Sequence, residues 1–280
     1  MSQSADATLA YSPCPNDTYI FAALTNGLLP NAPRVRVHLG DIEALNNDAL
    51  RGTFELTKVS YGAIPWLMDG YRILRAGGAL GRGCGPLVVT RPGQASSLEA
   101  LRDARFAIPG ERTTAFMLLQ LALGGRPATT QMRFDRIIPA IVAGEIDAGL
   151  IIHESRFTFR EAGLDCVADL GEWWERSSGM PIPLGAILVR NDVPHPRALE
   201  FNHAIAQSLA YARANEAAIM PFIRDHAFEM SDTVMRDHIA LYVNDYSEDI
   251  GEDGIAAVGE LFARARRAGI VDASTEPAFV

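Results

Sequence analysis

A histidine ends the stretch of this chain most suited to chemistry, because imidazole exchanges protons near neutral pH. His153 follows the apolar run Ala148 to Ile152, which we expect to form a buried strand. An apolar helical run, Ile137 to Ala143, precedes that strand and ends at Gly144. In open α/β sheets, ligands bind beyond the carboxyl ends of strands, so His153 could act as a general base. A core histidine that is hydrogen-bonded to the backbone would give the same local pattern.

The single lysine of the chain lies at a second predicted strand end. Lys58 stands among 24 arginines, in the strand candidate Phe54 to Ser60, which leads into an expected helix over Tyr61 to Met68. Lys58 and Ser60 are two residues apart, so they can face the same side of the strand. A lysine is a compact charge with rotatable donors, whereas arginine is a planar fork, so a tight site can require lysine. A chance survivor on the surface is the alternative.

A loop near the N-terminus offers donors to an anion. Residues 12–18, Ser-Pro-Cys-Pro-Asn-Asp-Thr, follow the strand candidate Thr8 to Tyr11. Two prolines predict irregular backbone there, and Asn16 belongs to a group of residues that commonly cap helices. The next apolar run, Tyr19 to Leu24, has helical spacing. A loop of this kind at a helix N-terminus is suited to a carboxylate.

A similar arrangement recurs in the middle of the chain. A strand is predicted over Arg105 to Pro109, and a helix that runs to Leu123 opens after Gly110. Thr113 and Thr114 place two hydroxyl groups beside the free N–H groups of that helix start. Capping alone would need only one of them, so we predict a further anion-binding position.

Two similar strands divide the chain. Gly85 to Arg91 and Pro183 to Arg190 are both apolar, end in arginine and precede a turn that contains proline. A chain that leaves one lobe by one strand and returns by the other forms an α/β protein of two lobes. We predict a discontinuous first lobe, residues 1–90 plus 190–280, and an inserted second lobe, residues 91–189. Ligand sites favour such interfaces, so the predicted strand ends should meet in the cleft.

The remaining features are read as structural. After Arg190 the apolar spacing predicts helices over residues 195–230, 232–243 and 254–268. Three isolated histidines on these helices are interpreted as surface or packing positions: His203, His226 and His238. Trp173 and Trp174 are interpreted as packing between the lobes.

The composition argues against several classes of function. A formal net charge of -9 and a pI near 5.2 do not suit nucleic-acid binding. No run approaches the roughly 18 apolar residues of a membrane-spanning helix. The three cysteines are widely spaced and no histidines have metal-ligand spacing, so we predict no metal site. Residues 1–10 lack the basic and apolar segments of a secretory signal, so we expect a cytoplasmic protein.

Together these motifs resemble the 1,4-dihydroxy-6-naphthoate synthase family of the futalosine route of menaquinone biosynthesis. The resemblance covers nearly the whole chain and rests on four segments: Ser12-Pro-Cys-Pro-Asn-Asp-Thr18, Lys58-Val-Ser60, Arg112-Thr-Thr-Ala115, and His153-Glu154 followed by Phe157-Thr158. It implies a fold like that of periplasmic binding proteins of type II, with two hinge-crossing segments. Tyr19, where phenylalanine would be expected, is a mild departure.

The resemblance also implies a carbon–carbon lyase that converts the cyclic dehypoxanthine form of futalosine to 1,4-dihydroxy-6-naphthoate without a metal or organic cofactor. His153 would be the proton acceptor. The motif match assigns substrate binding to six residues: Lys58, Val59, Ser60, Thr113, Thr114 and Ala115. Asn16, from the first loop, completes the predicted site for a small-molecule carboxylate.

Two other functions are compatible with the same fold. One is chorismate dehydratase, a sister enzyme of the same pathway, although His153 and the Ser-Pro-Cys-Pro-Asn-Asp opening favour the synthase. The other is a binding protein for a small carboxylate without catalysis, against which the missing signal segment argues. The sequence predicts no oligomeric state.

Overall fold

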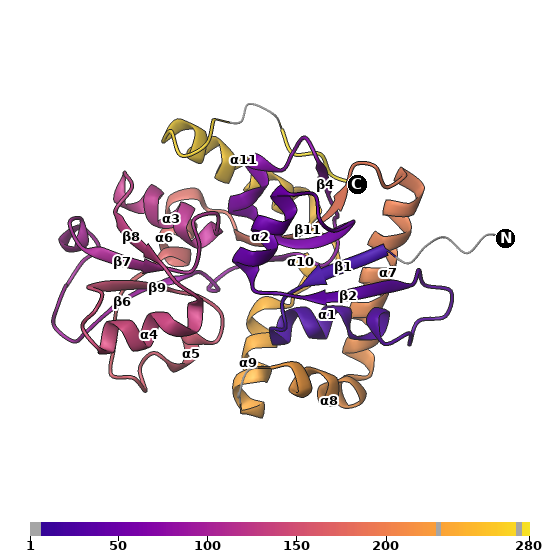
Figure 1. The fold of residues 1–280 in the computed structure, drawn as a ribbon, viewed down its shortest axis with the longest axis horizontal. Helices are drawn as coiled ribbons and strands as arrows, with labels where there is room; N and C mark the ends of the chain where they lie inside the picture. The colour runs from indigo at the N-terminus through magenta and orange to yellow at the C-terminus, as the bar shows by residue number, and fades with distance from the viewer. Residues whose placement is uncertain (1–6, 228–230, 273–275) are drawn as a thin grey trace.

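The strands of the computed structural model form two sheets, one in each lobe (Figure 1). The structure describes residues 7–227, 231–272 and 276–280. The first sheet has the order β2 (Val35–Leu39), β1 (Ala7–Tyr11), β3 (Leu56–Ser60), β11 (Ile182–Arg190) and β4 (Tyr71–Ile73), and β5 (Ala79–Gly81) also pairs with β11. The second has the order β10 (Asp165–Asp169), β6 (Leu87–Thr90), β9 (Ala148–Ile151), β7 (Arg105–Ile108) and β8 (Ala128–Gln131).

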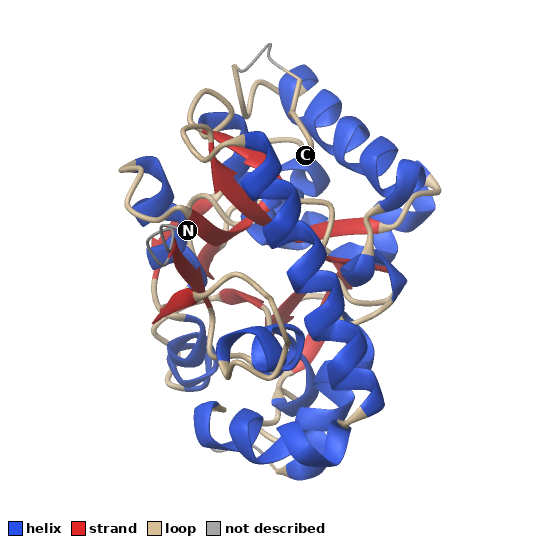
Figure 2. Ribbon diagram, turned by 90° about the vertical axis from the view of Figure 1, so that its right-hand side faces the viewer, coloured by secondary structure: helices blue, strands red, loops and turns tan. Residues whose placement is uncertain are grey.

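Helices pack around both sheets (Figure 2). They are α1 (Pro15–Thr25), α2 (Ile42–Leu50), η1 (Tyr61–Trp66), η2 (Glu99–Leu101), α3 (Thr114–Leu123), α4 (Phe134–Val142), α5 (Ser155–Thr158), α6 (Leu170–Ser178), α7 (His195–Ala214), α8 (Glu216–His226), α9 (Asp232–Tyr242), α10 (Asp245–Glu248) and α11 (Gly251–Arg267). Parts of two sequence predictions, residues 1–6 and 228–230, lie outside the described residues. Within the described part of the chain, no helix is long and apolar enough to cross a membrane.

Sheet pairing places the two dividing strands differently from the predicted lobe boundaries. β6 falls within the predicted first lobe, yet it pairs with β9 and β10 in the second sheet. Most of β11 falls within the predicted second lobe, yet it pairs with β3, β4 and β5 in the first sheet. Both strands are continuously apolar because both are central, and such a pattern does not reveal the sheet to which a strand belongs.

Two local predictions, for residues 12–18 and 61–68, differ from the structure because of prolines in those segments. The loop of residues 12–18 was expected to be irregular throughout, but α1 begins at Pro15, with Cys14 as its N-cap residue. Proline suits the first helical position, because no intrahelical bond is needed there and its φ is already helical. The helix expected over residues 61–68 is the 3₁₀ helix η1, which contains Pro65. A proline in a helix interior removes an N–H donor and disfavours the α form.

The start of α3 joins the two lobes. The Thr114 hydroxyl donates to the carbonyl oxygen of Leu184 at 2.8 Å and accepts from the Gly62 N–H at 2.9 Å. A Cβ atom on Gly62 would lie 2.7 Å from backbone atoms of Thr113. Only glycine allows this close approach between η1 and α3. The lobes therefore meet through backbone as well as side chains.

Of the tryptophan pair, Trp174 is completely buried. Its Nε1 donates to the carbonyl oxygen of Pro181 at 3.0 Å, and the Arg264 guanidinium lies 4.9 Å from its ring centroid. Arg264 belongs to α11, so Trp174 links the inserted segment to the C-terminal helices.

Candidate active site

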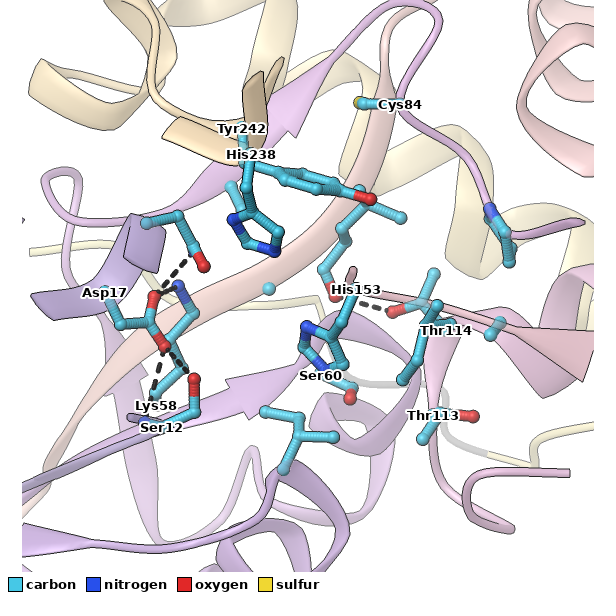
Figure 3. A pocket seen from close by; sticks show the side chains of 18 residues that line it. Ser12, Asp17, Lys58, Ser60, Cys84, Thr113, Thr114, His153, His238 and Tyr242 are labelled. Atoms are coloured by element: carbon cyan, nitrogen blue, oxygen red, sulfur yellow. Dashed lines mark hydrogen bonds and ion pairs between the residues drawn. The ribbon is translucent and has the colours of Figure 1, made fainter. Parts of the chain in front are cut away.

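A cavity of about 90 Å³ lies where the strand ends of the two sheets face each other (Figure 3). Each sequence-predicted site residue except Val59 lines it. Val59 is fully buried and packs in the hydrophobic core, because neighbouring residues of a strand point to opposite faces. The cavity therefore brings together residues from four separate segments of the sequence.

Lys58 is held by Asp17, a residue that the sequence pattern did not indicate as part of the site. Its Nζ donates to Oδ1 of Asp17, and both side chains are almost fully buried. The same carboxylate accepts from Ser12 Oγ at 2.7 Å and from Asn16 Nδ2 at 2.8 Å. We call these four residues the Asp17 cluster. In the sequence Asp17 is one of several polar residues in the loop of residues 12–18, although a buried lysine requires an acidic partner and could have directed attention to it.

Ser60 is held in place by Asn46 and has a hydroxyl hydrogen that is available to a ligand. Its Oγ accepts from Asn46 Nδ2 at 3.2 Å, and its N–H donates to Asn46 Oδ1 at 2.8 Å. In the hydrogen bonds that Ser60 makes with other described residues, its hydroxyl accepts and does not donate. Because Asn46 fixes the side chain, Ser60 can donate into the cavity without further ordering.

The threonines at α3 use their hydroxyl groups structurally. Thr113 caps the helix: its Oγ1 accepts from the Phe116 N–H at 3.2 Å and donates to the Gly110 carbonyl at 2.8 Å. Thr114 makes the interlobe contacts described above. The helix itself provides no acceptors for the N–H groups of Thr114 and Ala115, its first two residues. These amides, rather than the hydroxyls, are suited to an anion.

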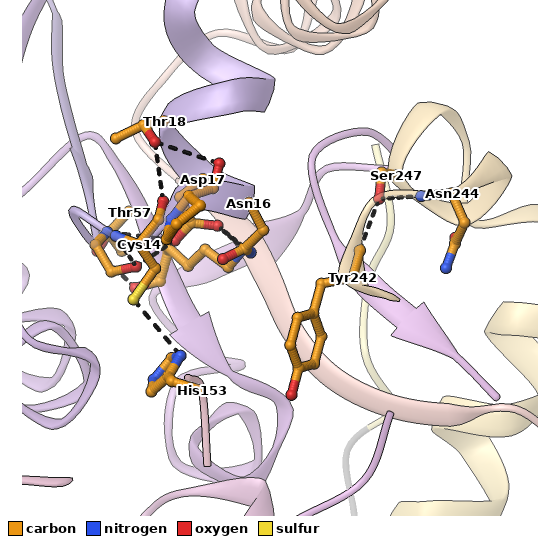
Figure 4. Close-up of polar contacts among 12 residues, drawn as sticks. Cys14, Asn16, Asp17, Thr18, Thr57, His153, Tyr242, Asn244 and Ser247 are labelled. Atoms are coloured by element: carbon orange, nitrogen blue, oxygen red, sulfur yellow. Dashed lines mark hydrogen bonds and ion pairs between the residues drawn. The ribbon is translucent and has the colours of Figure 1, made fainter. Parts of the chain in front are cut away.

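His153 lies directly beyond β9 in an uncommon backbone conformation. Its φ of +56° is in the left-handed region, which costs a residue with a side chain about 1–3 kcal/mol. Its Nδ1 is 3.5 Å from Sγ of Cys14, which reaches it from the other lobe (Figure 4). Burial raises the pKa of the Cys14 thiol, as do the nearby charges of Glu154 and Asp17, so Cys14 stays a neutral thiol. The Phe134 ring packs against the imidazole at 5.1 Å between centroids.

A second hollow, of about 200 Å³, adjoins the cavity. The two spaces share Ser12, Ile42 and His153 in their linings. His153 consequently stands between an inner and an outer space, where it can contact a molecule that occupies both.

A second histidine enters the site from α9. His238 was interpreted as a surface or packing residue, but it is completely buried and lines the cavity (Figure 3). Its ring lies 6.4 Å from that of His153, with an interplanar angle of 12°. A lone histidine on a helix gives no sequence signal of this kind, because only the packing of α9 against the first sheet brings it to the cavity. Across the described residues, no group of three or more potential metal ligands occurs.

Comparison with known proteins identifies the family of the chain. A family model for menaquinone biosynthesis matches residues 7–267. The 1,4-dihydroxy-6-naphthoate synthase of Thermus thermophilus is 47% identical over 272 residues, which cover 97% of this chain and 98% of that protein. The synthase of Streptomyces coelicolor is 44% identical over 270 residues, which cover 95% and 94%.

Solved structures extend the comparison to the fold. A protein from Archaeoglobus fulgidus aligns with a TM-score of 0.90 and 34% identity, covering 96% of this chain and 99% of its own. The alkanesulfonate-binding protein SsuA from Xanthomonas axonopodis aligns with a TM-score of 0.72 and 12% identity over 100% of both chains, a likeness of fold alone. The fold is therefore that of periplasmic binding proteins, as predicted. From its sequence matches, the chain belongs to the menaquinone biosynthesis family that includes the 1,4-dihydroxy-6-naphthoate synthases.

Proposed function

We propose that the cavity between the lobes converts the cyclic dehypoxanthine form of futalosine to 1,4-dihydroxy-6-naphthoate, with His153 as the general base. The observation that carries this assignment is the convergence of His153, Ser60 and the start of α3 on one cavity. The two synthases that match this chain over nearly its whole length support the reaction and favour it over chorismate dehydration. We further propose that the protein works in the cytoplasm and binds no nucleic acid.

The carboxylate of the substrate would be held by neutral donors. The Ser60 hydroxyl and the amides of Thr114 and Ala115 come from different lobes, and the positive end of the α3 dipole favours a negative charge there. The ammonium of Lys58 is already paired with Asp17, so it would not act as a free positive charge for the substrate. It would instead shape the cavity wall and add to the electrostatic field there. Apolar neighbours such as Ile152 and Leu184 would contact the rings of the substrate.

Binding of this substrate requires the lobes to separate. Small-molecule sites typically enclose roughly 300–1,000 Å³, well above the present cavity of about 90 Å³. A spiro-fused carbocycle and sugar would occupy the inner space and extend past His153 into the outer one. Hinge closure around a ligand is the usual motion of two-lobed proteins, and here it would bring Cys14 and His238 of one lobe to His153 of the other.

His153 would begin the reaction by removing a proton from the substrate, and the carbon–carbon bond would then break. General-base assistance contributes about 10²–10⁴-fold, so His153→Ala should lower kcat by that factor with little change in unfolding midpoint. Turnover would be measured by ultraviolet absorbance of the product with purified protein, with His203→Ala, an exposed histidine on α7, as the matched control. Near-normal turnover by His153→Ala would refute the role, and a wild-type protein that produces no 1,4-dihydroxy-6-naphthoate would refute the function.

A further inference from the structure

His238 is a buried polar group of the site to which the proposed reaction has so far assigned no chemical role. Neither of its ring nitrogens has a hydrogen-bond partner in the part of the chain that the structure describes. The ring points from α9 into the cavity, toward His153 (Figure 3). Its other ring neighbours are Tyr242 at 4.7 Å and Phe157 at 6.2 Å between centroids. His238 thus packs among aromatic rings and also lines the cavity.

An imidazole is an unfavourable choice for packing alone at this position. A buried polar group without a partner costs about 1–3 kcal/mol, whereas an apolar group of similar shape can be neutral or stabilising. Phenylalanine would fill the same space between Tyr242 and Phe157 without that cost. The presence of His238 in a cavity-facing position therefore points to a ligand that satisfies its nitrogens.

The charge state of His238 defines what it can offer. Its pKa lies well below the ordinary value, first because the ring is buried and then because His153 and Lys58 place positive charge nearby. The positive charge of Lys58 is paired with the negative charge of Asp17. Tyr242, which lies on α9 with His238, is neutral because burial raises its pKa. His238 is consequently a neutral imidazole with one N–H donor. A neutral histidine of this kind can polarise a carbonyl without giving up its proton.

We propose that His238 is a second catalytic residue, whose N–H donates a hydrogen bond to the substrate oxygen that becomes negative as the carbon–carbon bond breaks. This inference rests on the proposed function. His153 takes the proton of a substrate hydroxyl, and the O–H electron pair forms a carbonyl on one fragment. The electron pair of the broken carbon–carbon bond passes into a neighbouring carbonyl and forms an enolate on the other fragment. His238 keeps its proton throughout, and His153 returns its proton to the enolate.

The positions of the two imidazoles, on opposite lobes, suit proton transfer by His153 and hydrogen-bond donation by His238. The 6.4 Å between their centroids allows neighbouring atoms of one small molecule to contact both rings. A donor aimed at developing negative charge acts mainly in the transition state, so its loss lowers kcat more than it raises KM. Removal of one such donor costs roughly 10²–10³-fold in kcat.

The test replaces the N–H while keeping the ring. His238→Phe should lower kcat about 10²–10³-fold with KM within about threefold, while the unfolding midpoint stays level or rises. His238→Asn and His238→Gln carry an amide donor near one or the other ring nitrogen, so at least one should exceed the phenylalanine variant about tenfold. His203→Phe, the same change on an exposed part of α7, should match the wild type.

The outcomes separate the inference from the function on which it rests. A kcat of His238→Phe within about threefold of the wild type would overturn the catalytic role of His238, as would a loss confined to KM. A lowered unfolding midpoint, with neither amide variant better than phenylalanine, would assign His238 to structure and also overturn it. In all three cases an active wild type and an inactive His153→Ala protein leave the proposed function standing. A wild type without turnover overturns both.

Discussion

Two groups of polar side chains line the cavity, and they are built in opposite ways. In the Asp17 cluster one carboxylate accepts from a lysine, a serine and an asparagine, so the buried charges of Asp17 and Lys58 are paired. In the histidine pair, His153 has a strained backbone and a weak thiol contact, and His238 has no protein partner among the described residues. Both groups are close to the same space. Only the second contains buried polar atoms without a protein hydrogen-bond partner in the described part of the chain.

The difference separates residues that build the site from residues that act in it. A charge pair that is buried and fully hydrogen-bonded holds its surroundings in one arrangement, but it has little left to give to a ligand. Strain and unsatisfied polar groups are costs that a fold retains at functional positions. We therefore expect changes in the Asp17 cluster to lower stability first and changes in the histidine pair to lower turnover first.

The largest expected effect on stability comes from breaking the ion pair. Asp17→Asn keeps the shape of the side chain but leaves the buried ammonium of Lys58 without an anion. Removing one partner of a buried pair costs about 3–5 kcal/mol, which should appear as a lower unfolding midpoint in urea. This result would contrast with His238→Phe, whose midpoint should not fall.

A double variant provides the matched control for that comparison. Asp17→Leu with Lys58→Met removes both charges at similar volume, and apolar replacement of a whole pair is often close to neutral. It should regain at least half of the stability that Asp17→Asn loses. If Asp17→Asn unfolds at the wild-type urea concentration, the Asp17 cluster does not stabilise the fold, and the contrast between the two groups fails.

The sequence was most informative where polar residues follow a buried strand directly. His153, Lys58 and Ser60 could be placed because strand ends in α/β folds meet at one edge, so local pattern and site geometry coincide there. The strand pattern also predicted two lobes. It could not assign β6 and β11 to their sheets, because both are central strands with apolar residues on both faces.

Residues that depend on tertiary packing could not be found in this way. His238 lies on α9, far along the chain from the other site residues, and only the docking of that helix brings it to the cavity. The hydroxyl of Thr114 was expected to bind substrate, yet it is occupied by Gly62 and Leu184 of the other lobe. Such interlobe partners leave no periodic pattern in the sequence.

A smaller effect on turnover is expected at Cys14, which would position the catalytic imidazole. The Cys14 Sγ contacts Nδ1 of His153 at 3.5 Å and thus favours one orientation of the ring. A net hydrogen bond contributes about 0.5–1.5 kcal/mol, and a thiol is a weak partner, so Cys14→Ala should lower kcat about three- to tenfold. Cys14→Ser should recover part of this loss. If both variants have the wild-type kcat and pH profile, Cys14 only fills space.

The smallest expected effect is a change in acid stability at His238. The pKa of His238 in the folded state lies below the roughly 6.5 of an exposed histidine. As the pH falls, His238 is therefore protonated in the unfolded chain before it is protonated in the folded protein. The protonation of His238 therefore leaves the free energy of unfolding unchanged above about pH 6.5. Below that pH it lowers the free energy of unfolding by at most about 1.4 kcal/mol per pH unit. His238→Phe lacks this contribution. The difference in urea midpoint between wild type and His238→Phe should therefore shift in favour of the variant between pH 7.5 and 5.5. A constant difference across that range would mean that His238 accepts a proton in the folded state, where it could not remain the neutral donor proposed above.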